Sequence, residues 1–148
     1  MKTTLSKAIS LADKWFSLYV RLYGADYRGM VACVTCPTKK HFRDIDNGHY
    51  QGRNHKATRW HEQNGNPQCS QCNKWGQGEQ VKHARYIDNR YGKGTAEKLE
   101  VLAHTTVKLN VWDVLAIAKK YRELALIEAE KRGIDLGEPK TNRILDGL

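Results

Sequence analysis

Apolar positions along the chain follow a helical period in two long stretches. Between residues 4 and 23 they recur at steps of three and four, the spacing of one helix face, and Gly24 then predicts the helix end. Asn110, with Asp113 three residues later, is close to a capping box and predicts a second helix over 111–132 that Gly133 closes. The residues expected to face inward are Leu5, Ile9, Ala12, Phe16, Tyr19 and Tyr23 in the first helix, and Val114, Ala118, Tyr121, Leu124 and Ala125 in the second.

The middle of the chain has a different pattern, because residues 33–72 are polar and rich in turn-forming side chains. Residues 40–51 and 57–61 favour two short strands joined by a basic loop. Residues 73–91 favour a helix, although two glycines weaken its first turns. A strand pair followed by a helix is therefore expected here.

After residue 92 the pattern returns to helices. Thr95 is expected to cap a short helix that runs through Ala103. The tail after Gly133 contains Pro139 and few apolar residues, which favours loose order. The sequence therefore predicts an α+β chain in four parts: an N-terminal helical segment over 1–30, a core over 31–92, a C-terminal helical segment over 93–133 and a tail over 134–148.

Charge narrows the choice of partners. The 148 residues include 25 Lys and Arg against 16 Asp and Glu, a net charge of +9, and almost all of the excess lies within residues 1–90. A localised basic field favours a polyanion, most commonly nucleic acid, although a solvated basic surface without a partner is the alternative. The chain has no apolar run of about 18 residues that could span a membrane. Residues 1–15 lack the apolar segment of a signal peptide, so we expect a cytoplasmic protein with no membrane partner.

All cysteines of the chain fall into two Cys-x-x-Cys pairs, Cys33 with Cys36 and Cys69 with Cys72. Disulfides are disfavoured in a chain without a secretory signal. Two such pairs instead supply four thiolates for one tetrahedral Zn²⁺. We therefore predict one structural zinc ion per chain.

Zinc between the two pairs would bring two polar side chains together, with His49 on the first strand and Asn73 directly after the last cysteine. A histidine takes a proton from water at neutral pH, and an amide oxygen can help to bind Mg²⁺, so the pair suits phosphodiester hydrolysis. The alternatives are a histidine that hydrogen-bonds a strand or caps the zinc site, and an asparagine that caps a helix. Asn64 and Asn66 could either brace the loop or form a plain turn beside Gly65 and Pro67.

These residues also carry a resemblance. The stretches "CVTC", "NGHYQGRNH", "RWHEQNGNPQCSQCNKWGQGE" and "YIDNRYG" give the order Cys-x-x-Cys, Gly-His, Asn, Cys-x-x-Cys-Asn. This order resembles HNH endonucleases whose last position is asparagine, and it is closer still to the lambdoid phage NinG/Rap recombination proteins. The resemblance implies a zinc-stapled ββα-metal (HNH-like) core flanked by N- and C-terminal α-helices. It also implies an endonuclease that cuts branched DNA, namely Holliday junctions and D-loops, with Mg²⁺ or Mn²⁺.

The resemblance implies a role for each matched residue. His49 is the general base, Asn73 a ligand of the catalytic metal and Asn64 the structural middle asparagine, while Cys33, Cys36, Cys69 and Cys72 hold Zn²⁺. Many HNH sites place Asp or His before the base as a second metal ligand, but this chain has Gly48. Asp46 is the better substitute and Asp44 or water the others, because side chains alternate along a strand.

Further expectations concern DNA and assembly. Arg53, Lys56, Arg59 and Lys74 are candidates for phosphate contacts. Trp60 and Trp75 are expected to pack around the zinc rather than to stack on bases. A homodimer would match the near two-fold symmetry of a four-way junction, with the two amphipathic helices as its interface. The alternative functions are a non-catalytic zinc-finger DNA-binding protein and a sequence-specific HNH nuclease of the homing or restriction type.

Overall fold

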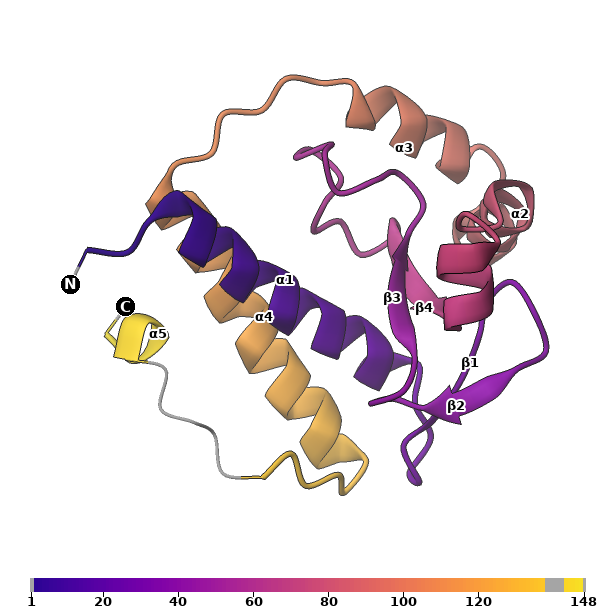
Figure 1. Ribbon diagram of the computed structural model, residues 1–148, viewed down its shortest axis with the longest axis horizontal. Helices are drawn as coiled ribbons and strands as arrows, with labels where there is room; N and C mark the ends of the chain where they lie inside the picture. Colours follow the sequence, from indigo (N-terminus) through magenta and orange to yellow (C-terminus); the bar gives the residue numbers. More distant parts are fainter. Residues whose placement is uncertain (1, 138–142, 148) are drawn as a thin grey trace.

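A computed structural model describes residues 2–137 and 143–147, and within them helices and short strands form a mixed α and β fold (Figure 1). The elements in chain order are α1 (Leu5–Tyr23), β1 (Met30–Ala32), β2 (Lys39–His41), β3 (Asp46–His49), β4 (Gly65–Gln68), the π-helical turn η1 (Gln71–Trp75), α2 (Gln80–Tyr91), α3 (Thr95–Ala103), α4 (Val111–Lys131) and α5 (Arg143–Asp146). No helix of the described residues is long and apolar enough to cross a membrane.

The largest core lies between α1 and α4, which run side by side in the same direction (Figure 1). Phe16 meets Tyr121 edge to face with ring centroids 4.9 Å apart, and Arg132 donates to the Tyr23 carbonyl near the far ends. The two apolar faces predicted from the sequence thus pack against each other within one chain, except that Tyr23, expected to face inward, is 49% exposed. They are not open for a dimer interface, and the homodimer itself stays a prediction.

The start and end of α4 follow the predicted capping chemistry, and α1 has a cap that was not predicted. Thr4 caps α1 by accepting from the Lys7 backbone N–H. Asn110 and Asp113 form a full capping box at the start of α4. Gly133 closes α4 in the left-handed region, at φ +65°, where a side chain would be strained. Both long helices are confirmed, with α4 one residue shorter than predicted.

Two antiparallel hairpins lie beside α1: β1 with β2, and β3 with β4. In the second, His49 is opposite Gly65 and Asp46 is opposite Gln68. The predicted strand over 57–61 is wrong, since those residues form turns and the partner of β3 is Gly65–Gln68. The β4 strand is buried along its whole length, so it lacks the polar–apolar alternation that marks an exposed strand.

A smaller cluster joins the second hairpin to the following helices. Tyr50, Ile87, Ala96 and Leu99 are buried together, with α2 and α3 packed around them. The predicted helix over 73–91 is interrupted by a turn at residues 76–79, so it divides into η1 and α2. Gly94, not Thr95, is the residue before α3, and the Thr95 hydroxyl donates to the Gly92 carbonyl.

Part of the predicted tail contacts the core. Leu145 is buried, and Arg122 of α4 pairs with Asp146. Residues 138–142, which include Pro139, and residue 148 lie outside the described residues. The division of the chain into four parts stays a prediction.

Candidate functional site

The first candidate site is the cysteine cluster. The sulfur atoms of Cys33, Cys36, Cys69 and Cys72 all lie within 4.8 Å of one another, and none is in a disulfide. Tetrahedral zinc with Zn–S bonds of about 2.3 Å places its sulfurs roughly 3.8 Å apart. The Cys36 and Cys69 sulfurs are 3.7 Å apart. The donor set and its spacing therefore fit one structural Zn²⁺.

Zinc at this position would join the two hairpins. Cys33 and Cys36 follow β1, whereas Cys69 and Cys72 follow β4 and enter η1. Burial raises the pKa of Cys69, and it raises the pKa of Cys72 to about 12, while hydrogen bonds from Thr38 lower the pKa of Cys36 to about 6. A cation would replace the protons that the two buried thiols otherwise keep.

The second candidate site is a polar cleft of about 610 Å³ between β3, η1 and α1. It brings together Asp46, His49 and Asn73, which the sequence analysis had assigned to a single site. Asn73 Nδ2 lies 3.1 Å from Asp46 Oδ2 and donates to it. A carboxylate and an amide thus meet at the point where η1 leaves the cysteine cluster.

Gly48 does not face this cleft. A Cβ at position 48 would overlap the side-chain amide of Gln68, which is fully buried. Gln68 in turn donates to the Thr35 hydroxyl at 3.1 Å and to the Gly78 carbonyl at 2.9 Å. An acidic residue at position 48 therefore has no room, and Asp46 is the carboxylate of this strand that reaches the cleft.

His49 is held by one backbone contact. Its Nε2 lies 3.0 Å from the Arg59 carbonyl, and because a carbonyl only accepts, Nε2 carries the hydrogen and Nδ1 keeps a free lone pair. Burial lowers the pKa of His49 below its ordinary 6.5, although the Arg59 carbonyl opposes part of this effect. The ring is therefore neutral at pH 7 and able to accept a proton.

Arg59 supports this contact rather than facing a ligand. Its sequence position makes it a candidate for a phosphate contact, but its Nε and Nη2 donate to the two carboxylate oxygens of Asp13 at 2.9 and 2.6 Å. Its Nη1 donates to the Arg53 carbonyl at 2.8 Å. Trp60 Nε1 donates to the same Asp13 at 3.0 Å. The loop after β3 is thereby tied to α1.

Asn64 and Asn66 are both buried and lie outside the cleft. Asn64 accepts from Gln51 N at 2.7 Å and donates to the carbonyls of Gln51 and Thr58, each at 3.0 Å. It therefore closes the loop between β3 and β4. Asn66 donates to the Gln63 carbonyl and contacts Nε2 of the buried His83 at 3.0 Å.

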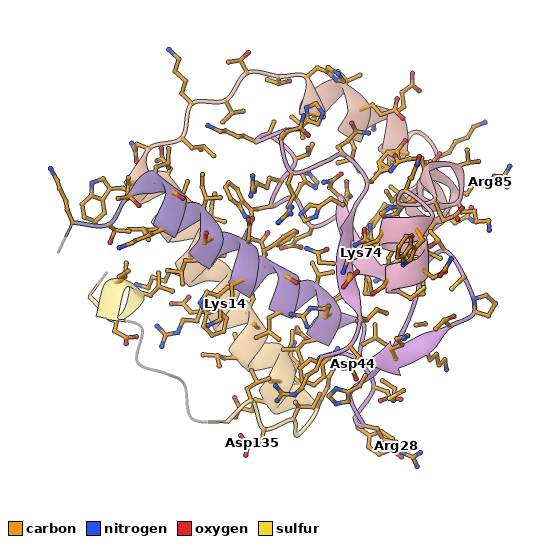
Figure 2. The ribbon with its side chains drawn as sticks, in the orientation of Figure 1. Lys14, Arg28, Asp44, Lys74, Arg85 and Asp135 are labelled. Atoms are coloured by element: carbon orange, nitrogen blue, oxygen red, sulfur yellow. The ribbon has the colours of Figure 1, made fainter. Side chains whose placement is uncertain are left out.

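Cations outnumber carboxylates around the cleft. Arg53 and Lys74, both assigned to phosphate from the sequence, line it, and Lys74 lies beside β3 (Figure 2). Lys56 is exposed on a different hollow. The polar and charged lining residues that were not predicted from the sequence are Asp13, Ser17, Arg21, Arg43 and Asn47. Contacts between α1 and β3 bring most of these together, and only the folded chain shows those contacts.

Asn47 is unusual among them. Both polar atoms of its side-chain amide are buried and have no hydrogen-bond partner among the described residues. Its neighbour across the hairpin is Pro67, which has no N–H to offer. Buried polar groups are nearly always paired, so the unpaired amide of Asn47 is an exception in the wall of the cleft.

The two tryptophans near the site differ. Trp60 is buried at 8% exposure, but its indole donates to Asp13 on α1, and no contact with the cysteine cluster is found among the described residues. Trp75 is 79% exposed, so the expectation that it packs around the zinc is wrong. Its side chain points away from the core because η1 turns its buried side, at Cys72, toward the cysteine cluster.

Comparison with known proteins gives one result. A family model described as Bacteriophage Lambda NinG protein matches residues 2–131, which include both candidate sites. No curated protein and no solved structure matches the chain.

Proposed function

Because the chain belongs to the bacteriophage lambda NinG family, which indicates a role related to phage recombination, we propose that it is an endonuclease for branched recombination intermediates such as Holliday junctions and D-loops. The observation that supports this most is the shared cleft of His49, Asp46 and Asn73. A hairpin followed by a helical turn, with a histidine on the strand and an asparagine on the turn, is the arrangement expected of an HNH-like ββα-metal core.

In this proposal His49 activates the attacking water. Its Nδ1 lone pair is free because Nε2 donates to the Arg59 carbonyl. The lowered pKa keeps that lone pair unprotonated at neutral pH. A fixed, neutral imidazole at the edge of a basic cleft is suited to take the proton from water as its oxygen attacks phosphorus.

Asp46 and Asn73 are the residues that would hold Mg²⁺ or Mn²⁺. They offer a carboxylate oxygen and, after a half-turn of the amide, an amide oxygen. Two such ligands, completed by water and phosphate oxygens, meet the preference of Mg²⁺. When bound, the cation neutralises charge on the phosphate and stabilises the leaving oxygen.

The cations around the cleft position the DNA strand. Arg21, Arg43, Arg53 and Lys74 face two carboxylates, Asp13 and Asp46, and Asp13 is already paired with Arg59. The remaining positive charge favours a phosphate backbone and makes binding salt-dependent. Arg53 is 64% exposed and lies 3.9 Å from Asp13, an exposed ion pair that is weak enough for a phosphate to replace.

The test compares DNA structures and variants. Labelled four-way junction, flap and linear duplex are incubated with the zinc-loaded protein, either with Mg²⁺ or with no added divalent cation. We expect Mg²⁺-dependent nicks in branched DNA, lost in His49→Ala while binding persists. His104→Ala is the matched control, because His104 is an exposed histidine on another element.

The other outcomes identify the alternatives. Band shifts without nicks in any metal would mean a zinc-dependent DNA-binding protein. One cut at a fixed site in linear duplex would mean a sequence-specific HNH nuclease. Sedimentation that finds only monomers at micromolar concentration, with and without junction DNA, would contradict the homodimer. The cytoplasmic location stays a prediction.

A further inference from the structure

Trp75 is the most exposed large hydrophobic side chain among the described residues, at 79%. Leaving an indole in water forgoes the free energy of burying it, and single exposed apolar residues often have no function. The position of this one is different, because Trp75 directly follows Asn73 and Lys74, which line the proposed catalytic cleft.

The turn that carries Trp75 is closely fixed. Gly76 N donates to the Gln71 carbonyl at 2.7 Å, and Gly78 N donates to the Cys72 carbonyl at 2.9 Å. A Cβ at position 76 would lie 2.9 Å from the Cys72 carbonyl, so only glycine fits there. The indole is thus presented from a backbone held by the cysteine cluster, and a fixed backbone lowers the entropy lost on binding.

The backbone after Gly76 is strained. Gln77 and Glu79 have φ of 53° and 46°, in the left-handed region that side chains rarely adopt. Such strain persists where surrounding contacts impose it and gathers at functional sites. Here it ends η1 directly after Trp75 and turns the chain into α2, so the indole stands at the end of the turn.

We propose that Trp75 stacks on an unpaired nucleobase next to the scissile phosphate, and that this contact gives the enzyme its preference for branched over linear DNA. The proposal rests on the proposed function, because it assumes that the strand lies in the cleft beside Lys74 and Asn73. Trp75 is two Cα–Cα steps of about 3.8 Å from Asn73. The indole itself does not line the cleft, and residues two apart on a helical turn face different sides, so the base that it would reach is one or a few nucleotides away from that phosphate.

The charge of the neighbouring cleft and the aromatic ring of Trp75 together favour an unpaired nucleobase as the ligand. The cleft cations favour a phosphate backbone, and every base has a face on which an aromatic ring can stack. In a continuous duplex those faces are covered by neighbouring base pairs. Branch points, gaps and single-stranded ends expose them, so an exposed indole that directly follows the cleft-lining Lys74 would distinguish branched from linear substrates.

Binding is measured first, with no added divalent cation and in a His49→Ala background, so that no strand is cut. Trp75→Ala should weaken binding to a junction with unpaired bases by about tenfold to a hundredfold, as expected for a lost base–aromatic stack. Its affinity for linear duplex should not change. Trp75→Phe should keep most of the preference, and Trp112→Ala is the control, since Trp112 is also exposed, at 69%, but lies on α4.

Fluorescence gives an independent result. Trp15 and Trp60 are buried, so in a Trp112→Phe protein the response to DNA comes mainly from Trp75. Junction DNA should quench it and linear duplex should not. Equal loss of affinity for both DNAs in Trp75→Ala, no loss at all, or no quenching would overturn the proposal.

The experiments distinguish failure of the nuclease assignment from failure of the Trp75 stacking contact. If the wild-type protein cuts no DNA while Trp75→Ala loses junction binding selectively, the nuclease assignment fails and the stacking contact stands. If the protein cuts branched DNA but Trp75→Ala keeps its full branch preference, the stacking contact fails alone.

Discussion

Replacing Asp13 by asparagine removes one negative charge from the contact that joins α1 to the loop after β3. Asp13 accepts two hydrogen bonds from the Arg59 guanidinium and one from the Trp60 indole. The side chains of Arg59 and Asp13 are only 18% and 21% exposed. Arg59 also supplies the carbonyl that receives the His49 Nε2 hydrogen, so the change acts on both stability and the proposed general base.

The cost in stability follows from the burial of the pair. Removing one partner of a fully buried ion pair costs about 3–5 kcal/mol, because the other charge is left without compensation. This pair keeps some access to water, and asparagine retains one acceptor oxygen. We therefore expect Asp13→Asn to lower the free energy of unfolding by about 2 kcal/mol and Asp13→Ala by about 3 kcal/mol.

The effect on catalysis is separable from the loss of stability. Without its tether the Arg59 carbonyl no longer fixes the imidazole, and a misplaced catalytic group costs up to about a hundredfold in rate. The Asp13 charge and the Arg59 hydrogen bond both raise the pKa of His49 against the larger effect of burial. Losing either lowers that pKa further, so the acid limb of the rate profile should move to lower pH.

The assay combines urea unfolding of the zinc-loaded protein with single-turnover cleavage of a junction between pH 5 and 8. Asp44→Asn is the matched control, since Asp44 is exposed in the turn before β3 and labelled in Figure 2. Asp13→Asn should bind junction DNA as the wild type does and cut it more slowly. An unfolding midpoint equal to that of Asp44→Asn, or an acid limb moved to higher pH, would refute this account of how His49 is held.

Three further outcomes are expected. A strong chelator, or Cys69→Ser, should unfold the region joined by the cysteine cluster, because structural zinc is worth about 10 kcal/mol or more, comparable with the stability of a whole domain; metal analysis that finds no zinc in the purified protein would contradict this. Junction cleavage should lose rate only below pH 6.5, since His49 must be neutral and burial lowers its pKa; an acid limb above pH 6.5 would count against His49 as the base. Burial lowers the pKa of His83 to about 4, so between pH 6.5 and 4 the unfolded chain binds more protons than the folded chain. As the pH is lowered through this window, the free energy of unfolding should decrease by up to about 3 kcal/mol. Urea unfolding of His83→Gln should show a smaller fall over this window, and an equal fall would contradict the assignment.

Local patterns were enough to predict the long helices and the cysteine cluster. The three- and four-residue spacing in α1 and the Asn110–Asp113 box are short-range signals that later packing does not override. The Cys-x-x-Cys pairs work in the same way, because their chemistry is set by spacing within each pair. The true β4 gave no such signal, since Gly65–Gln68 is buried on every position and contains a proline.

Arg59 is a candidate for a phosphate contact from the sequence because it lies in a basic segment, and nothing near it in sequence predicts an ion-pair partner. Its partner, Asp13, is 46 residues away on α1. Trp75 was assigned to the core because aromatic residues next to zinc ligands usually pack there, whereas the π-helical turn leaves it exposed. A contact distant in sequence places Arg59, and a backbone geometry without a sequence signature places Trp75, so neither position could be predicted from the sequence.

Gly48 shows how a contact distant in sequence, here with Gln68, determines which position of a strand can supply a metal ligand. The Gln68 amide fills the space that a side chain at position 48 would need, and Gln68 is itself anchored to Thr35, between the first two cysteines. A metal ligand directly before His49 is therefore incompatible with this packing. Asp46 is two residues earlier and is carried by the register of the hairpin to a place where it reaches Asn73. If the cleft binds a divalent cation, the packing that excludes a carboxylate at position 48 is also what makes Asp46 the strand's ligand.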